Sequence, residues 1–237
     1  MGRGSSPDDK APSLSKWLRE PLCIPKIAAA PFRTPVKSDR VGGGRPAIVL
    51  PGMASGDSST ALLRNSLREA GYEPSPAGLG RNLTITRDNF ASLETLLASE
   101  VQRTGKPALL LGWSLGGLYA RVLAQRHPDQ VALVATLGTP FSGDRHANNA
   151  WRIYELLADH TVAQPPLPDD PAIKPDVHTI AFWSPKDGVI APRCARGEVN
   201  ERDEAIELPF RHFEMGCSRP AVRKILNILN DRIRQLG

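Results

Sequence analysis

The sequence predicts an α/β protein with a mostly parallel sheet of about six strands and helices on both faces. Short, continuously apolar runs alternate with longer segments in which apolar residues recur at helical spacing. The 237 residues, 41% hydrophobic and 23% charged, are enough to bury one substantial core. A strandless, proline-rich stretch at about 141–175 interrupts the alternation and predicts a helical cap insertion.

The first part of the chain, residues 1–40, predicts a disordered, proline-rich arm outside the sheet. Disorder is expected up to about residue 12, and Ser13 to Arg19 can form one short helical turn. The prolines that follow exclude a long helix or a central strand, because proline lacks an N–H and fixes φ. We expect the arm to lie across the domain formed by residues 41–237.

The expected strands are short and apolar, as in sheets buried on both faces. They lie at 47–50, near 72, at 108–111, 131–137, 177–183 and 205–208. Right-handed crossovers between parallel strands bring their carboxyl ends to one edge of the sheet. Ligands bind at that edge in such folds, so functional residues are expected at the strand ends.

The expected helices carry their apolar residues on one face and stop at glycine or proline. They lie at 58–70, 86–104, 114–125, 151–158 and 219–236. Gly71 and Gly105 end the first two, and Pro128 stops the third. Val222, Ile225, Leu226, Leu229 and Ile233 form the buried stripe expected for the last helix.

The segment 112–116 reads Gly-Trp-Ser-Leu-Gly and lies between an expected strand and an expected helix. That context fits a nucleophile elbow, in which a sharp turn exposes the serine and leaves no room for side chains nearby. Ser114 is therefore the predicted nucleophile. The alternative is a serine that only caps the helix of an ordinary turn.

A serine nucleophile needs a base to take its proton and an acid to orient that base. Of the five histidines, His212 is the best candidate, because it lies in a loop between the last strand and the last helix. Asp187 follows the strand 177–183 by a short turn, where its carboxylate can reach an imidazole. The alternative for Asp187 is a turn-forming Asp before Gly. The other candidate acids are Asp159, Asp169, Asp170 and Asp176.

Stabilising an oxyanion requires two N–H donors. The first is expected from Leu115, directly after the serine, and the second from Met53 in the loop after the first strand. The alternative for residues 51–56 is a plain turn between a strand and a helix.

Together these segments resemble the α/β-hydrolase superfamily, specifically its small bacterial lipase- and esterase-like members. The matching segments are 49–53, 112–117, 137–140, 184–189 and His212. The resemblance implies an α/β-hydrolase fold in which Ser114, Asp187 and His212 form the catalytic triad. Three departures from the family pattern stand out: Pro51-Gly52 where His-Gly is common, Glu214 where glycine is common, and no sign of the first antiparallel strands.

The insertion at 141–175 resembles the lids of lipases. We expect five apolar residues of its helix to cover or line an acyl pocket: Trp151, Ile153, Tyr154, Leu156 and Leu157. Trp113, Trp151 and Tyr154 are the predicted substrate-binding residues. The alternative is a rigid cap that does not gate the site.

The predicted function is a serine hydrolase that cleaves small-molecule or lipid carboxylic esters, with no cofactor and no metal. An acyltransferase with the same triad and a non-catalytic lipid-binding protein of the same fold are the alternatives. The proline-rich arm, residues 14–36, could also make weak contact with a membrane surface. Oligomeric state and acyl length stay open.

Charge, hydropathy and cysteine content bear on nucleic-acid binding, localisation and metal binding. The net charge of +5 comes without basic runs interleaved with aromatic residues, so nucleic-acid binding is not expected. No apolar run suggests a signal peptide or a membrane span, so a cytoplasmic protein is expected. The three cysteines fit no metal motif, although Cys194 and Cys217 could form one disulfide.

Overall fold

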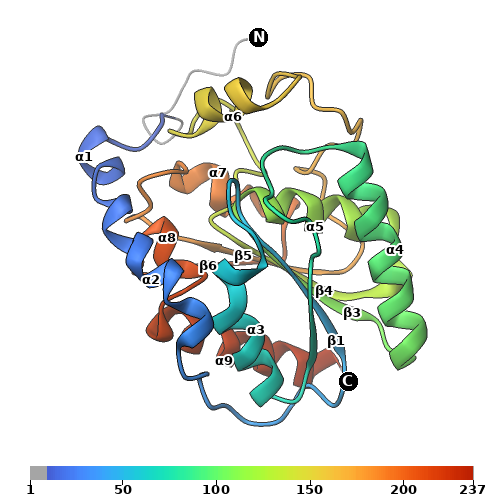
Figure 1. Cartoon of the computed structure of the whole chain (residues 1–237). Helices are drawn as coiled ribbons and strands as arrows, with labels where there is room; N and C mark the ends of the chain where they lie inside the picture. Colours follow the sequence, from blue (N-terminus) through green and yellow to red (C-terminus); the bar gives the residue numbers. More distant parts are fainter. Residues whose placement is uncertain (1–9, 237) are drawn as a thin grey trace.

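The structure, a computed structural model, describes residues 10–236 and contains one six-stranded sheet (Figure 1). The strand order is β2-β1-β3-β4-β5-β6, and each adjacent pair is parallel. The strands are β1 Pro46–Leu50, β2 Glu73–Pro76, β3 Ala108–Trp113, β4 Val131–Leu137, β5 His178–Trp183 and β6 Glu204–Glu207. This confirms the predicted α/β class and the predicted sheet. No antiparallel strand precedes β1 within the described residues.

The sheet is buried on both faces because successive strand side chains point to opposite sides. In β1, Val49 belongs to one hydrophobic core, whereas Ile48 and Leu50 belong to the other. In β3, Leu109 and Leu110 are divided between the two cores in the same way. The continuous apolar runs of the sequence therefore reflect burial on two faces.

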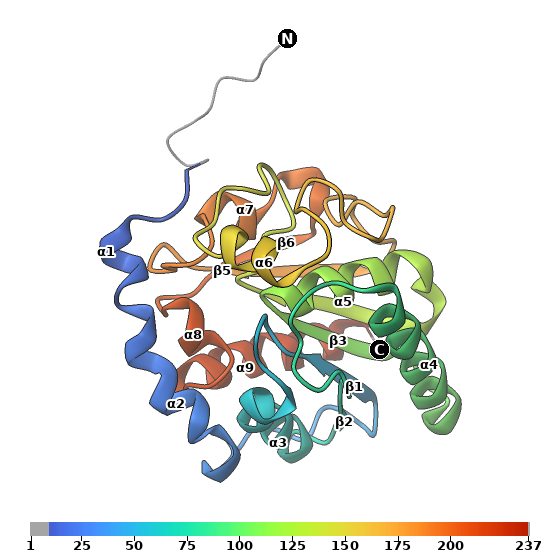
Figure 2. The same cartoon turned by 45° about the horizontal axis from the view of Figure 1, so that its top comes forward.

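Two pairs of helices cover the two faces (Figure 2). Helices α3 (Ala61–Glu69) and α9 (Arg219–Leu236) pack on one face, and α4 (Arg87–Thr104) and α5 (Leu115–Arg126) on the other. The stripe predicted for α9 is fully or almost fully buried. Thr86 caps α4 by accepting a hydrogen bond from the N–H of Asn89.

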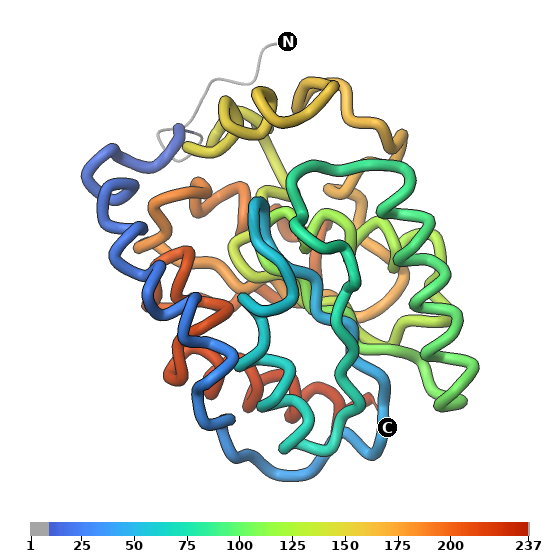
Figure 3. The backbone as a smooth tube through the Cα atoms, viewed as in Figure 1, coloured from blue at the N-terminus to red at the C-terminus, as the bar shows by residue number. Residues whose placement is uncertain are grey.

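The proline-rich arm forms four short helical segments along one side of the molecule, beside α8 and α9 (Figure 3). They are α1 Leu14–Trp17, η2 Glu20–Cys23, α2 Ile24–Ala28 and η3 Ala30–Phe32. At its far end the N–H of Val36 donates to Ser66 Oγ of α3, and the Arg219 guanidinium donates to the carbonyl of Thr34. The disorder expected at residues 1–12 falls mostly outside the described residues.

The remaining short helices follow the strand ends. They are η4 Asp57–Thr60, η5 Pro128–Gln130, α6 Trp151–Leu157, α7 Pro192–Arg196, η6 Val199–Glu201 and α8 His212–Met215. The sequence predicts α6 but not α7 or α8, because four or five residues are too few to show a helical period. The first helix was expected at 58–70 and divides into η4 and α3.

Arg121 of α5 ties the segment that contains α6 to the rest of the molecule. It is 1% exposed and donates to the carbonyls of Pro171, Ile173 and Glu201. Its guanidinium carbon lies 4.0 Å from the centroid of the Phe141 ring. Burial lowers the pKa of this arginine to about 10, so it remains charged at neutral pH.

Two expectations from the sequence concern a disulfide and a membrane-spanning helix. Cys194 and Cys217 do not form the disulfide that the sequence left possible: the two are not bonded to each other and lie in different hydrophobic clusters. Within residues 10–236, no helix has both the length and the apolar character needed to cross a bilayer.

Candidate active site

Ser114 lies at a sharp turn between β3 and α5. Its backbone has φ 53° and ψ −119°, a conformation that L-residues rarely adopt. The turn is held from both sides, because the Ser114 N–H donates to Leu137 O and the Ser114 carbonyl accepts from Thr139 Oγ1. A strained residue that its surroundings fix in place is typical of functional sites.

Three glycines around Ser114 allow its turn to pack closely. A Cβ on Gly112 would lie 2.3 Å from Gly117 Cα, and one on Gly116 would lie 2.4 Å from the carbonyl oxygen of Leu50. A Cβ on Gly117 would lie 2.0 Å from Thr139 Oγ1. The pattern of residues 112–117 therefore has a steric cause, and an ordinary capped turn would not require it.

His212 and Asp187 form a buried, hydrogen-bonded pair. His212 Nδ1 lies 2.8 Å from Asp187 Oδ2, and the two side chains are 2% and 1% exposed. Asp187 Oδ1 accepts the N–H groups of Val189 and Ile190, both at 2.8 Å. Because Nδ1 of the imidazole is bound to the carboxylate, Nε2 is left for another partner.

The charge environment of His212 favours its protonated form. Burial opposes the charge, but the carboxylates of Asp187 and Glu20 outweigh burial and raise the pKa of His212 above its ordinary 6.5. His212 is the first residue of α8, rather than part of the loop predicted from the sequence. The ring centroid of Trp113, the residue before Ser114, lies 6.1 Å from the centroid of the His212 imidazole ring.

The two predicted oxyanion donors flank the serine. Leu115 is the first residue of α5, and Met53 lies in the loop after β1. A Cβ on Gly52 would lie 3.4 Å from Ser114 Cβ, so this loop packs directly against the serine. Within residues 10–236, neither the Met53 N–H nor the Leu115 N–H has an acceptor.

Asn82 braces the Met53 loop, a role that sequence reasoning did not find. It is fully buried. Its side-chain Nδ2 donates to Pro51 O, and its backbone carbonyl accepts the Ala54 N–H. Its own N–H donates to Ser55 O. These contacts hold the loop at Pro51-Gly52, where the family pattern often has His-Gly.

None of the alternative acids makes a described hydrogen bond to the His212 imidazole, and the other histidines have partners of their own. Asp159 bonds His160, Asp169 bonds Arg126, Asp170 caps the N–H of Ala172, and Asp176 is exposed. His127 and His178 each bond a glutamate, and His146 bonds Asp144.

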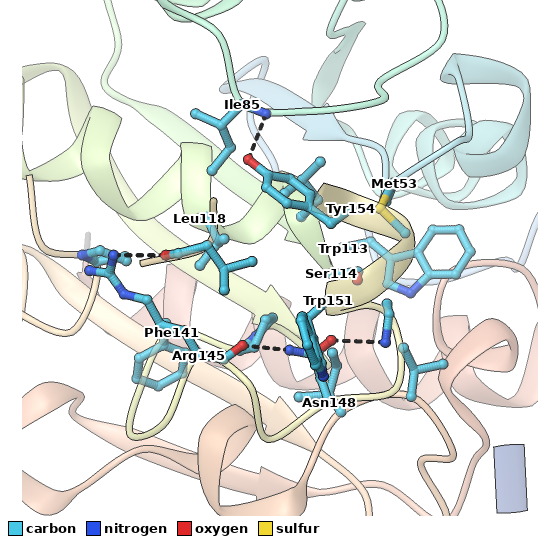
Figure 4. Close-up of a pocket in the computed structure, with 18 of the residues that line it drawn as sticks. Met53, Ile85, Trp113, Ser114, Leu118, Phe141, Arg145, Asn148, Trp151 and Tyr154 are labelled. Atoms are coloured by element: carbon cyan, nitrogen blue, oxygen red, sulfur yellow. Dashed lines mark hydrogen bonds between the residues drawn. The ribbon is translucent and has the colours of Figure 1, made fainter. Parts of the chain in front are cut away.

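A cavity of about 730 Å³ opens beside the serine, and Ser114 and His212 both line it. Its other lining residues are mostly apolar, and they come from the arm, the Met53 loop, α5, the insertion that contains α6, and the segments next to Asp187 and His212. Figure 4 shows Met53, Trp113 and Ser114 close together, with Trp151 and Tyr154 of α6 beside them. The three predicted substrate-binding residues, Trp113, Trp151 and Tyr154, thus share one cavity.

Tyr154 fixes α6 over this cavity. Its hydroxyl accepts the N–H of Ile85 (Figure 4) and also lies 2.7 Å from His160 Nε2. Burial raises the pKa of the hydroxyl to about 12, so it is neutral at physiological pH. The prediction for Leu156 and Leu157 is wrong, because neither lines the cavity and the two are 84% and 45% exposed. A seven-residue helix presents both of them to the outside.

Glu20 is a buried polar residue that sequence reasoning missed entirely. Its side chain is fully buried, and it accepts N–H groups from Gly188, His212 and Phe213. Glu214, expected to bring charge near the site, forms an ion pair with Lys26 of the arm. Burial opposes ionisation of Glu214, but Lys26 outweighs it and holds its pKa below the ordinary value.

No group of three or more His, Cys, Asp or Glu side chains within residues 10–236 has an arrangement suited to a metal ion. Besides Ser114 and His212, the polar residues that line the cavity include Ser55, Ser142, Arg145, Asn148, Asp169 and Asp170.

Comparisons with known proteins agree with this fold. The family model described as alpha/beta hydrolase fold matches residues 53–170. The chain therefore has the alpha/beta hydrolase fold, as the resemblance implied. A search of curated protein sequences found no match.

Among solved structures, the chain is similar to several lipolytic enzymes at low identity. A soluble variant of monoglyceride lipase from Saccharomyces cerevisiae is 14% identical, with a TM-score of 0.59 over 86% of this chain and 90% of that one. A structure from work on the metagenome-derived lipolytic enzymes LipS and LipT is 14% identical, with a TM-score of 0.62 over 86% and 100%. An alpha/beta superfamily hydrolase from Oenococcus oeni PSU-1 is 18% identical, with a TM-score of 0.60 over 84% and 94%. At these identities the likeness concerns the fold.

Proposed function

We propose that the protein is a cofactor-free serine hydrolase that cleaves carboxylic esters with an apolar acyl chain. The observation that carries the proposal is the buried His212–Asp187 pair, whose histidine lines one mostly apolar cavity together with a serine in a strained elbow. The lipase and esterase neighbours support the same reaction class by analogy of fold.

In this mechanism Ser114 Oγ attacks the ester carbonyl while His212 Nε2 accepts its proton. The negative charge that develops on the carbonyl oxygen is stabilised by the N–H groups of Met53 and Leu115. His212 then gives the proton to the departing alcohol, and an acyl-enzyme forms on Ser114. Water attacks the acyl-enzyme through the same base, and the free acid leaves. Asp187 fixes the imidazole tautomer and stabilises the imidazolium.

The test is hydrolysis of p-nitrophenyl esters across acyl lengths, with Ser114→Ala as the matched variant. We expect Ser114→Ala to lose at least about 10³-fold in kcat, since the nucleophile and the base act as a unit. Turnover similar to the wild type in this variant would refute the mechanism. Adding an alcohol acceptor separates acyl transfer, which yields a new ester, from hydrolysis, which yields only the acid.

The cavity wall at α6 is the proposed acyl site. Trp151, Ile153 and Tyr154 line the cavity from the insertion. Deleting residues 146–170 should shift or broaden the preference for acyl length, because this wall disappears. Leu156→Ser is the control, since that side chain is 84% exposed and does not line the cavity. An unchanged preference in the deletion variant would remove the proposed role of α6.

We also infer that the arm makes a weak contact with anionic lipid surfaces. Leu14, Leu18 and Leu22 follow one another at four-residue spacing and are 69%, 66% and 68% exposed. Glu20 is the single acid between residues 10 and 36, and it is buried. The cations of that segment are Lys10, Lys16, Arg19, Lys26 and Arg33. Exposed leucines beside an excess of positive charge fit the boundary between lipid headgroups and acyl chains.

Sedimentation with vesicles of phosphatidylcholine and phosphatidylglycerol tests this contact. The triple variant Leu14→Ser, Leu18→Ser, Leu22→Ser should bind less than the wild type. A control variant, Ile173→Ser with Val199→Ser, removes two exposed apolar side chains away from the arm and should bind normally. Equal sedimentation of the wild type and the triple variant would contradict the inference.

A further inference from the structure

The carboxylate of Glu20 lies between the two segments that carry the Asp187–His212 pair. Its Oε1 accepts the N–H of Gly188 at 2.8 Å and the N–H of His212 at 3.0 Å. Its Oε2 accepts the N–H of Phe213 at 3.1 Å. The Glu20 side chain thus contacts Gly188, which follows Asp187, and also contacts His212 and its neighbour Phe213.

The three N–H groups offset the cost of burying this carboxylate. Glu20 is fully buried, and within residues 10–236 it makes no ion pair with a lysine or an arginine. A buried charge without a counter-ion is costly unless hydrogen bonds satisfy it. Those bonds come only from the two segments at the candidate site, so the carboxylate is stable only when both are in place.

The arm is packed too closely against the acid segment to shift independently. A Cβ on Gly188 would lie 2.5 Å from the carbonyl oxygen of Lys16 and 2.9 Å from Glu20 Cγ. Lys16 Nζ donates to Pro185 O on one side, and Arg211 Nη1 donates to Arg19 O on the other. The position of Glu20 is therefore fixed from both directions.

We propose that Glu20 is a positioning residue, which holds the acid and base segments at hydrogen-bonding distance from each other. The proposal rests on the proposed function, because it assigns Asp187 and His212 as the acid and the base. Glu20 itself lies on the backbone side of the pair and does not reach the reacting atoms.

The charges around His212 make this role measurable. Asp187 faces the ring from the end of β5, and Glu20 faces its backbone from the arm. Glu214 lies on α8 itself, where Lys26 and Arg211 neutralise it. The Asp187 carboxylate raises the pKa of His212 more than the Glu20 carboxylate does, and both raise it. Removing the charge at residue 20 should therefore lower that pKa.

The experiment compares Glu20→Gln and Glu20→Ala with the wild type by kinetics and by NMR titration of the His212 ring. Gln preserves size but removes the charge, and its NH₂ group cannot accept an N–H. In both variants we expect the His212 pKa, and the acid limb of kcat/KM with it, to fall by about 0.5–1 unit. We expect Glu20→Ala to lose about 10- to 100-fold in kcat with little change in KM, because misplaced catalytic groups slow the chemical step.

Asp203→Asn is the matched control. Asp203 Oδ2 also accepts a backbone N–H, from Thr179, but it does so near the start of β5, at the opposite end from Asp187. This variant should lose stability without changing the His212 titration or the acid limb. If the Glu20 variants behave in the same way, Glu20 only stabilises the fold and the proposal is overturned.

The two readouts separate this proposal from the proposed function. The NMR titration does not depend on any ester being hydrolysed. A wild type that is inactive on esters but shows the expected titration shift in Glu20→Gln would contradict the proposed function and support the charge effect of Glu20. An active wild type whose Glu20→Gln variant keeps both its titration and its acid limb would contradict the positioning role alone.

Discussion

Gly138 follows β4 and lies against both members of the buried pair. Its φ is +56°, and a Cβ there would lie 2.9 Å from His212 Nδ1 and 3.0 Å from Asp187 Oδ2. Gly138→Ala should therefore push the imidazole away from the carboxylate and reduce kcat by about 10- to 100-fold. Steady-state kinetics on a p-nitrophenyl ester would measure the loss.

Gly105→Ala controls for backbone strain in the Gly138 experiment. Gly105 has φ +67° at the end of α4, with open space where its Cβ would be. Both variants should lose about 1–2 kcal/mol of unfolding free energy, because a left-handed conformation is unfavourable for alanine. Only Gly138→Ala should lose activity. Equal activity in the two variants would show that the close contact at Gly138 has no effect on the pair.

The raised pKa of His212 makes the stability of the protein depend on pH. The native state binds the imidazole proton more tightly than the unfolded chain, whose histidine titrates near 6.5. The stabilisation is fully present below pH 6.5 and is lost as the pH rises through the higher folded value. The unfolding free energy of the wild type minus that of His212→Gln should thus be larger at pH 5.5 than at pH 8. Urea titrations would measure it, and a difference that grows with pH would contradict the assignment.

Residue patterns allowed Ser114, Asp187 and His212 to be singled out from the sequence, and the structure places all three at one edge of the sheet. Glu20 could not be found in this way. Its partners are backbone N–H groups 168, 192 and 193 residues further along the chain, and no spacing or motif records such contacts. Asn82 was missed for the same reason, because it acts through the backbone of another loop.

Among the elements, α5 carries two neighbouring arginines that hold the α6 segment in different ways. Arg121 is buried and bonds backbone carbonyls, whereas Arg126 is one-third exposed and pairs with Asp169. Arg121→Met should cost about 2–3 kcal/mol of unfolding free energy, because it leaves buried carbonyls without donors. Arg126→Met should cost about 0–1 kcal/mol, as exposed ion pairs do.

Denaturant unfolding with hydrogen exchange would compare the two arginine variants. Faster exchange at residues 165–176 is expected in Arg121→Met alone. Equal stability losses in the two variants would contradict the view that Arg121 is the main anchor of this segment.

The accuracy of the predicted elements depends on their length. Periodicity identified α4 and α9, each of 18 residues, and apolar runs identified the strands other than β2, which the sequence placed only near residue 72. Helices of four or five residues, such as α7 and α8, show no period and take their shape from the segments they pack against. The arm follows the same rule, since its short helices form between prolines that permit only one turn at a time.

On the scale of the whole molecule, the described part of the arm is attached to the domain at several points. Its contacts include Val36 with Ser66, Thr34 with Arg219, and Glu20 with two segments at the sheet edge. Detaching it would expose the Glu20 carboxylate, the core residue Val36 and the buried Cys23 together. We therefore expect the arm to unfold with the domain in one cooperative step.

Thiol labelling at pH 8 tests this expectation. Cys23 belongs to the arm and Cys217 to the core, and both are fully buried. Burial raises the pKa of Cys217 to about 12 and also raises that of Cys23, so both thiols stay protonated until they are exposed. The two should react at the same rate, measured by mass spectrometry of labelled peptides. Much faster labelling of Cys23 would show that the arm detaches by itself.

The distance along the chain between Glu20 and its partners has a consequence for biosynthesis. At about 5–20 residues per second, the ribosome adds Gly188 some ten to thirty seconds after Glu20, a span of 168 residues. Throughout that time the carboxylate has no native partner and stays hydrated. The carboxylate can dock only after α8 has been made, so arm docking belongs to the final stage of folding, when contacts of very long range close. A nascent chain that ends before Phe213 would hold the serine elbow but neither a complete site nor a fixed arm.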